Sequence, residues 1–206
     1  MPLVMTTWRW GRKATFVAYS AKPTMTMAEL VKLHRECKTF MERNAVLMTP
    51  KPLRQSSDRA PALMQMLWER HGILPRNLIL VEVVHPKVPY ITDSRYVVTI
   101  FDRDKSRGSI ISVEVSFGFM EEPNVERLLE EMARHKEIDL PTDPRQWIVH
   151  ASHENLLPLK KRTGMLRRLR LRLFMFLRLV SQPAYYYYGL GDEVQLSVEI
   201  IPVRVQ

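Results

Sequence analysis

Residues 108–123 read Gly-Ser-Ile-Ile-Ser-Val-Glu-Val-Ser-Phe-Gly-Phe-Met-Glu-Glu-Pro, and the pattern changes within them. The first half alternates apolar and polar residues, which is the period of a strand with one buried face. Phe-Gly-Phe-Met then carries the chain out of the sheet. A helix is predicted to open at Glu121, Glu122 and Pro123, because proline suits the first helical position and carboxylates suit the positive end of the helix dipole. Apolar residues at helical spacing follow at Val125, Leu128, Leu129 and Met132.

The preceding segments predict an α/β fold. We expect a strand at 44–49, a helix from Pro61 to a left-handed cap at Gly72, and an almost unbroken apolar strand after Asn77. Such a run indicates a central strand covered on both faces, so these elements form a right-handed βαβ unit. Residues 96–101 predict a further strand that pairs antiparallel with the opening stretch. The predicted fold is therefore α/β: a mixed sheet with one βαβ unit, an antiparallel hairpin and helices packed on its faces.

A helix is also predicted before the first strand. Thr26 and Glu29 have the spacing of a capping box, in which each side chain bonds the backbone of the other residue. Its apolar face continues through Leu30, Val31, His34, Cys37 and Met41. The position of His34 on that face favours a packed histidine over a metal ligand. Cys37 is the only cysteine, which excludes an internal disulfide and fits a reducing compartment.

The formal net charge of +9 comes mainly from one segment, because residues 155–191 contain eight Lys or Arg and no Asp or Glu. Residues 164–180 fit a helix. Its predicted core face is an arc of about 100° without arginine, formed by Leu166, Leu169, Leu173, Phe176, Leu177 and Val180. The other side mixes Leu171, Phe174, Met175 and Leu179 with four arginines. This mixture suits an anionic lipid surface or a partner protein. The alternative is a second buried face past which the arginines reach to water.

The remaining patterns exclude several function classes. The sequence has no dinucleotide-binding or phosphate-binding glycine loop, no H-E-x-x-H and no nucleophile elbow. His150, His153 and Glu154 come nearest to a metal cluster, but a histidine pair at i, i+3 beside a carboxylate is common by chance and no third ligand is evident. The basic segment lacks a recognised nucleic-acid-binding motif. Tyr185–Tyr188 fit a covered strand, and a closing strand is expected at 194–203.

The N-terminal residues combine two tryptophans with basic side chains, which fits either packing on the domain or a position at a membrane interface. No stretch has the 18 or more consecutive apolar residues of a membrane span. Residues 1–13 are predicted to end a helix or to begin a short one. Trp8 and Trp10 lie beside Arg9, Arg12 and Lys13, and tryptophan and positive charge both accumulate at the cytoplasmic side of membranes.

Several segments together resemble one family. SVEVSFGFMEEPNV at 112–125 resembles the RYGFMEEPDV signature in the cytosolic tail of Kup-type potassium uptake permeases. AVLMT at 45–49 is similar to the first strand of that tail, and residues 61–85 resemble its next helix and strand. HASHENLLP at 150–158 resembles its S-R-E-T-L-V-P segment. Finally, LVMTTWRWGR at 3–12 is similar to the cytosolic end of the last membrane helix. The resemblance covers nearly the whole chain.

The resemblance carries expectations about function. Kup-type proteins are secondary potassium permeases, understood as proton symporters with ion sites in membrane helices. The resemblance implies that residues 1–22 are the end of a last membrane helix plus a linker. It also implies that residues 23–206 are a cytosolic α/β domain similar in shape to universal stress proteins. Such tails are thought to regulate transport and, in some members, to assemble dimers. The chain is then expected to be a regulatory fragment at the cytoplasmic face of the cell membrane, with the membrane part of the transporter as its partner. A homodimer is a second expected assembly.

The alternative function is a free-standing basic α/β adaptor or sensor that binds a membrane surface or an acidic partner. The residues predicted to contact a membrane surface or partner are Trp8, Arg9, Trp10, Arg12, Arg167, Arg168, Arg172, Met175 and Arg178. The family-signature residues, expected to have a structural role, are Gly118, Phe119, Met120, Glu121, Glu122 and Pro123. No catalytic residue, metal ligand, cofactor or nucleic-acid partner is predicted.

Overall fold

The computed structural model describes residues 2–20, 24–104, 106–157, 165–181, 187–190 and 194–204. The chain divides into two compact units. The helical unit comprises residues 1–23, 152–184 and 199–206, and the α/β unit comprises residues 24–151 and 185–198. Each unit has its own packing, and the α/β unit holds the sheet predicted from the opening stretch.

The sheet follows the prediction of a mixed α/β fold. Its strands among the described residues are β2 (Asn44–Met48), β4 (Asn77–Val84), β5 (Tyr96–Asp104), β6 (Gly108–Ser116), β7 (Trp147–Leu157) and β8 (Gln195–Arg204), in the order β5-β6-β4-β2-β7-β8. β2, β4, β6 and β7 pair in parallel, while β5 runs antiparallel to β6. The expected βαβ unit, hairpin and closing strand are therefore confirmed.

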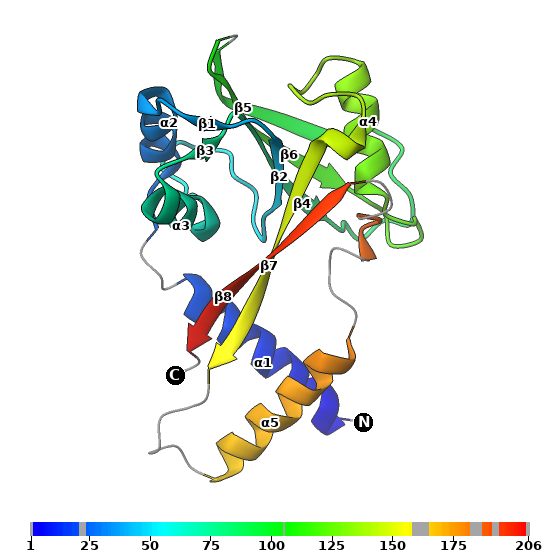
Figure 1. The fold of residues 1–206 in the computed structure, drawn as a ribbon. Coiled ribbons are helices and arrows are strands. Elements are labelled where there is room, and N and C mark those ends of the chain that lie inside the picture. The colour runs from blue at the N-terminus through cyan, green and yellow to red at the C-terminus, as the bar shows by residue number, and fades with distance from the viewer. Residues whose placement is uncertain are drawn as a thin grey trace. The chain divides into compact units, whose positions relative to one another are not determined.

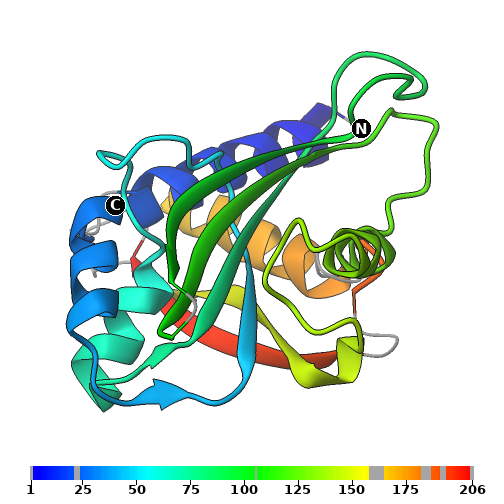
Figure 2. The same cartoon turned by 90° about the horizontal axis from the view of Figure 1, so that it is seen from above.

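Helices cover both faces of this sheet (Figures 1 and 2). α2 (Met27–Glu36) and α3 (Ala62–His71) share one apolar cluster with alternate residues of β2 and β4, and α4 (Val125–Arg134) shares the other. The central strands are therefore buried from both sides, which explains the apolar run at Leu78–Val81. Trp147 is fully buried in the cluster under α4 and donates its indole N–H to the Pro141 carbonyl at 2.8 Å. It follows the 3₁₀ turn η1 (Pro144–Gln146).

Two of the predicted helix caps form as the local sequence pattern indicates. The Thr26–Glu29 capping box forms as predicted, with the Glu29 amide donating to Thr26 Oγ1 at 3.2 Å and the Thr26 amide to Glu29 Oε2 at 2.7 Å. Gly72 caps α3 with φ of 65°. However, α2 ends at Glu36, before Met41, because Phe40–Met41 form the short strand β1, parallel to β3 (Leu74–Pro75).

Two local predictions were wrong. α4 begins at Val125 and not at Pro123, because the Asn124 side chain accepts the Arg127 amide at 2.9 Å and serves as the cap. Tyr187 is helical and Tyr188 lies in a turn, so neither residue lies in a strand. The Tyr188 carbonyl accepts the Val125 amide at 3.0 Å, which closes this turn over the start of α4. Tyr185 and Tyr186 lie outside the described residues.

The helical unit is built on α1 (Pro2–Ser20) and α5 (Met165–Val180). The predicted helix at 164–180 is confirmed, and α1 is longer than the short N-terminal helix that we expected. The two helices pack against each other, as both ribbon views show (Figures 1 and 2). The ends of β7 and β8 belong to this unit as well.

Candidate functional site

The contact between α1 and α5 is centred on the Phe174 ring and Gly11. Phe174 is 2% exposed, and its ring lies against Gly11, where a Cβ atom would overlap it. The Trp8 ring lies 5.7 Å from the Phe174 ring, centroid to centroid. Arg170 stacks over the Trp10 ring at 4.9 Å and donates to the Thr6 carbonyl at 3.0 Å. Phe174 is therefore the buried centre of the helical pair.

This packing reverses the predicted orientation of α5. Leu169, Phe176 and Val180 were expected in the core, but they are 64%, 61% and 69% exposed, whereas Leu171 and Phe174 are buried. Both sides of this helix are apolar, so periodicity could not identify the covered side. Gly11 favours the side that carries Phe174, because the absence of a side chain at Gly11 leaves room for that ring.

The outward face of α5 combines apolar and basic side chains. At 100° per residue, its exposed residues span an arc of about 140° centred opposite Phe174. They are Met165, Arg168, Leu169, Arg172, Met175, Phe176, Leu179 and Val180. We call these eight residues the α5 outer face. Neither helix contains a carboxylate.

The predicted contact residues divide between this face and other positions. Arg168, Arg172 and Met175 lie on the α5 outer face, while Arg178 is half-buried. Trp8 and Trp10 are half-buried because they pack on α5, whereas Arg9 and Arg12 are exposed on α1. The side chain of Arg167 lies outside the described residues. The structure thus brings most of the basic candidates onto one pair of helices.

The signature residues form a tight turn and not a helix start. Gly118 is buried, and a Cβ atom there would overlap the Pro89 carbonyl. The amides of Phe119 and Met120 donate to the Val88 and Pro89 carbonyls at 3.0 and 3.1 Å. This turn therefore ties the segment after β6 to the segment after β4.

Glu121 has a different role from the one predicted. Its carboxylate accepts the Gly118 amide at 2.7 Å and pairs with Arg95 at 2.8 Å. The hydrogen bond from the Gly118 amide is the main cause that lowers the pKa of Glu121, and Arg95 lowers it further. Glu122 is exposed and Pro123 is buried before α4. The signature carboxylate thus holds a turn and does not complement a helix dipole.

Two side chains of this turn remain at the surface. Phe119 is 65% exposed and Met120 is 62% exposed, close to the exposed Val88 and Tyr90 of the neighbouring segment. The signature therefore combines a fixed backbone with apolar side chains that face solvent.

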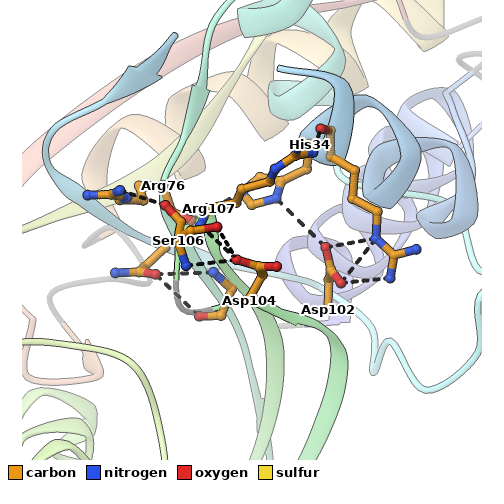
Figure 3. Close-up of polar contacts among 9 residues, drawn as sticks. His34, Arg76, Asp102, Asp104, Ser106 and Arg107 are labelled. Atoms are coloured by element: carbon orange, nitrogen blue, oxygen red, sulfur yellow. Dashed lines mark hydrogen bonds and ion pairs between the residues drawn. The ribbon is translucent and has the colours of Figure 1, made fainter. Parts of the chain in front are cut away.

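A polar cluster joins the end of α2 to the tip of the β5–β6 hairpin (Figure 3). His34 is buried, with Nε2 3.1 Å from the Arg76 carbonyl and Nδ1 4.0 Å from Asp102. Burial lowers the pKa of His34. Arg35 forms a bidentate pair with Asp102, with its shortest contact at 2.8 Å. His34 is thus a packed histidine, as predicted.

The arginines of this cluster bind parts of the fold itself. Arg76 donates to the Ser106 carbonyl at 2.7 Å, and Arg107 donates to the Arg35 carbonyl. Asp104 accepts the amides of Ser106 and Arg107 at the hairpin tip. These contacts secure the hairpin, and we assign the cluster a structural role.

The structure describes the side chain of only one of the three metal candidates. His150 is buried on β7 opposite Leu47, and the side chains of His153 and Glu154 lie outside the described residues. Within the part of the chain that the structure describes, no group of three or more His, Cys, Asp or Glu side chains could hold a metal ion. Among the same residues, no helix combines the length and apolarity needed to cross a membrane.

Sequence reasoning missed one group of charged residues. Glu82 on β4, Glu114 on β6 and Arg54 in the loop after β2 lie together in the α/β unit. A signal was present, because each glutamate is the single carboxylate in an otherwise apolar or neutral strand. Their proximity depends on the strand order, which the local pattern does not contain.

Comparisons with known proteins identify the family. The family model for the K+ potassium transporter C-terminal domain matches residues 42–201. A probable potassium transport system protein Kup of Acidiphilium cryptum is 27% identical over 198 residues, which cover 96% of this chain and 29% of that protein. The Kup 1 proteins of Geobacter sulfurreducens and Syntrophobacter fumaroxidans are 27% and 28% identical and cover the same share of this chain.

The chain spans about 30% of the length of these curated relatives. No solved structure matches it significantly. The family match includes the whole sheet from β2 to most of β8, together with the signature turn and α5. The chain belongs to the family of potassium transporter C-terminal domains.

Proposed function

We propose that this chain is the cytosolic regulatory region of a Kup-type potassium transporter, of the K+/H+ symport type. The observation that carries the proposal is the family match over residues 42–201, together with relatives that are named potassium transport proteins. The signature turn supports it, because Gly118 and Glu121 have specific structural roles there. Transport itself is assigned to the membrane part, which is the proposed partner.

A chimera tests this regulatory role. The tail of the Acidiphilium cryptum relative is replaced by this chain, and potassium uptake is measured in cells that lack their own uptake systems. We expect the chimera to retain uptake and its dependence on external potassium, whereas a tailless transporter loses one or both. An unrelated soluble domain of similar length serves as the control. Uptake equal to that of the control fusion would refute the regulatory role.

We further propose that the helical unit contacts the anionic cytoplasmic surface of the membrane. Arg168 and Arg172 lie one turn apart on the α5 outer face, among exposed Leu169, Phe176 and Leu179. Apolar side chains can enter the interfacial region of a bilayer while arginines bind lipid phosphates. Because α1 and α5 carry no carboxylate, no acidic side chain on them opposes an anionic surface.

Flotation with liposomes measures this contact. We expect binding to phosphatidylglycerol-rich vesicles at low salt, and little binding to neutral vesicles or at about 1 M salt, where the Debye length falls to about 3 Å. Each basic group near such a surface contributes about 1 kcal/mol, so Arg168→Gln with Arg172→Gln should weaken binding about 30-fold.

The matched control removes two arginines elsewhere. Arg127→Gln with Arg134→Gln lowers the net charge equally on α4, where both side chains are exposed. We expect the control pair to bind nearly as well as the unmodified chain. Equal losses for the two pairs, or no binding at low salt, would refute the contact through α5. Binding to vesicles without any effect in the transport chimera would favour the free-standing adaptor.

A further inference from the structure

Glu82 and Glu114 lie side by side on the sheet of the α/β unit. The two residues are register partners on the parallel strands β4 and β6. Leu78 and Leu80, at the alternate positions before Glu82, belong to the apolar cluster under α2 and α3. Because side chains alternate along a strand, Glu82 points to the same face, beyond the end of that cluster.

The two carboxylates differ in their partners. Arg54 donates to Glu114 from Nε at 3.0 Å and from Nη2 at 2.5 Å. Oε2 of Glu82 is buried and has no hydrogen-bond partner among the described residues. Burial raises the pKa of Glu82 to about 7, the charge of Glu114 adds to the rise, and Arg54 opposes it.

The neighbouring elements supply few other charges. At the end of β2, the neutral Thr49 hydroxyl is bonded to the Val81 and Lys51 carbonyls at 3.3 and 3.1 Å. On β5, Val97 is the residue opposite Glu114. Glu114 and Arg54 are therefore the charged groups that act on Glu82 in this part of the sheet.

Arg54 belongs to a loop that holds the start of α2. Asp58 accepts the amides of Arg54 and Gln55 at 2.8 and 2.7 Å, which fixes the loop internally. The carbonyls of Ser56 and Asp58 then accept the first amides of α2, Ala28 at 2.9 Å and Met27 at 2.8 Å. A change in the ion pair of Arg54 can therefore alter the hydrogen bonds at the N-terminus of α2.

We propose that Glu82 and Glu114 share one proton and act as a carboxylate latch on the Arg54 loop, residues 50–60. When Glu82 is protonated, its O–H donates to a Glu114 oxygen, and Arg54 faces a single negative charge. When the proton leaves to solvent, two carboxylates attract Arg54, and the loop is held more firmly against the start of α2. The latch rests on the α/β unit alone and not on the proposed transport role.

Side-chain carboxyl NMR of the full chain from pH 4.5 to 9 tests the shared proton. We expect Glu82 to titrate with a midpoint near neutral pH. Glu114→Gln removes the neighbouring negative charge and should lower this midpoint by about 1 pH unit, while Arg54→Gln should raise it. Glu130→Gln, which removes a half-buried carboxylate paired with Arg134 on α4, is the matched control and should leave the Glu82 midpoint unchanged.

The coupling to α2 has its own measurement. Hydrogen exchange at the Met27 and Ala28 amides, corrected for the intrinsic pH dependence, should slow between pH 6 and pH 8, and Glu82→Gln should abolish this change. Exchange that is insensitive to pH in the unmodified chain would overturn the latch. A Glu82 midpoint in the ordinary range of about 4 to 5 would overturn the shared proton itself. Should a variant fail to fold, these two measurements on the unmodified chain still decide the matter.

Discussion

Replacement of Gly118 by alanine tests whether the signature glycine is required by space. A Cβ atom at this position would overlap the carbonyl of Pro89 and approach the Tyr90 amide nitrogen to 2.7 Å. Both contacts are to backbone, so no side chain can rotate away. The segment that contains Gly118 and the segment that contains Pro89 must then separate.

The expected cost follows from the lost contacts. Overpacking typically costs about 1–3 kcal/mol. Separation also weakens the Phe119–Val88 and Met120–Pro89 hydrogen bonds, each with a net value of about 1 kcal/mol. We therefore expect Gly118→Ala to lower the free energy of unfolding of the α/β unit by about 2–4 kcal/mol.

Gly72→Ala is the matched control, because Gly72 has an unusual backbone conformation but free space around it, whereas Gly118 lacks that space. Gly72 has φ of 65°, and no neighbouring atom lies within 4 Å of the position that an alanine Cβ would take. Alanine there costs only the left-handed backbone, about 1 kcal/mol. Urea unfolding monitored by near-UV signals of the buried Trp147, with exchange at the Phe119 amide, measures both variants. A loss at Gly118 below about 0.5 kcal/mol, or one no larger than at Gly72, would contradict the steric argument.

Three further predictions concern the α/β unit. Glu82→Gln should stabilise the chain at pH 8 but not at pH 4.5: the folded pKa of about 7 lies above the ordinary 4.5, so the charged form costs stability as pH rises between these values. The full difference between the two pKa values corresponds to about 3 kcal/mol, and partial exposure of Glu82 reduces this to about 1–2 kcal/mol. Urea unfolding at both pH values measures the gain in stability, and an equal gain at both would contradict the raised pKa of Glu82. Thr26→Ala removes the hydroxyl that accepts the Glu29 amide and should cost about 1 kcal/mol, measured by thermal unfolding, with no change meaning that the cap adds nothing. Phe119→Ser with Met120→Ser should change stability by less than about 0.5 kcal/mol, because both side chains face solvent, and a larger loss in urea would show that they are covered.

The signature shows how far a local pattern can be interpreted. The sequence correctly places a strand before it and a helix after it. It does not place the Glu121 carboxylate, because the partners of that group are the Gly118 amide and Arg95, which precedes it by 26 residues. A helix-dipole role was the simplest local account, and the tertiary contact replaced it. The true cap, Asn124, follows the general preference for asparagine at helix starts.

The basic helix shows a different limit. Its helical period and its charge are clear in the sequence, and the structure confirms the helix. The side without arginine was therefore expected in the core, but the opposite side also carries apolar residues that can be covered. The choice is made by α1, more than 150 residues away, where Gly11 leaves space for the Phe174 ring.

The amino-acid sequence alone determined the α/β class, the βαβ unit, the hairpin, the caps at Thr26 and Gly72, and the family. The structural features depend on periodicity, turn residues and neighbouring side chains, which act over a few residues, whereas the family follows from the resemblance of several segments. The tertiary structure decided which side of α5 is covered, what Glu121 binds and that Glu82 faces Glu114. Those outcomes depend on strand order, register and the space left by distant residues, because the contacts that fix them join segments far apart in the chain.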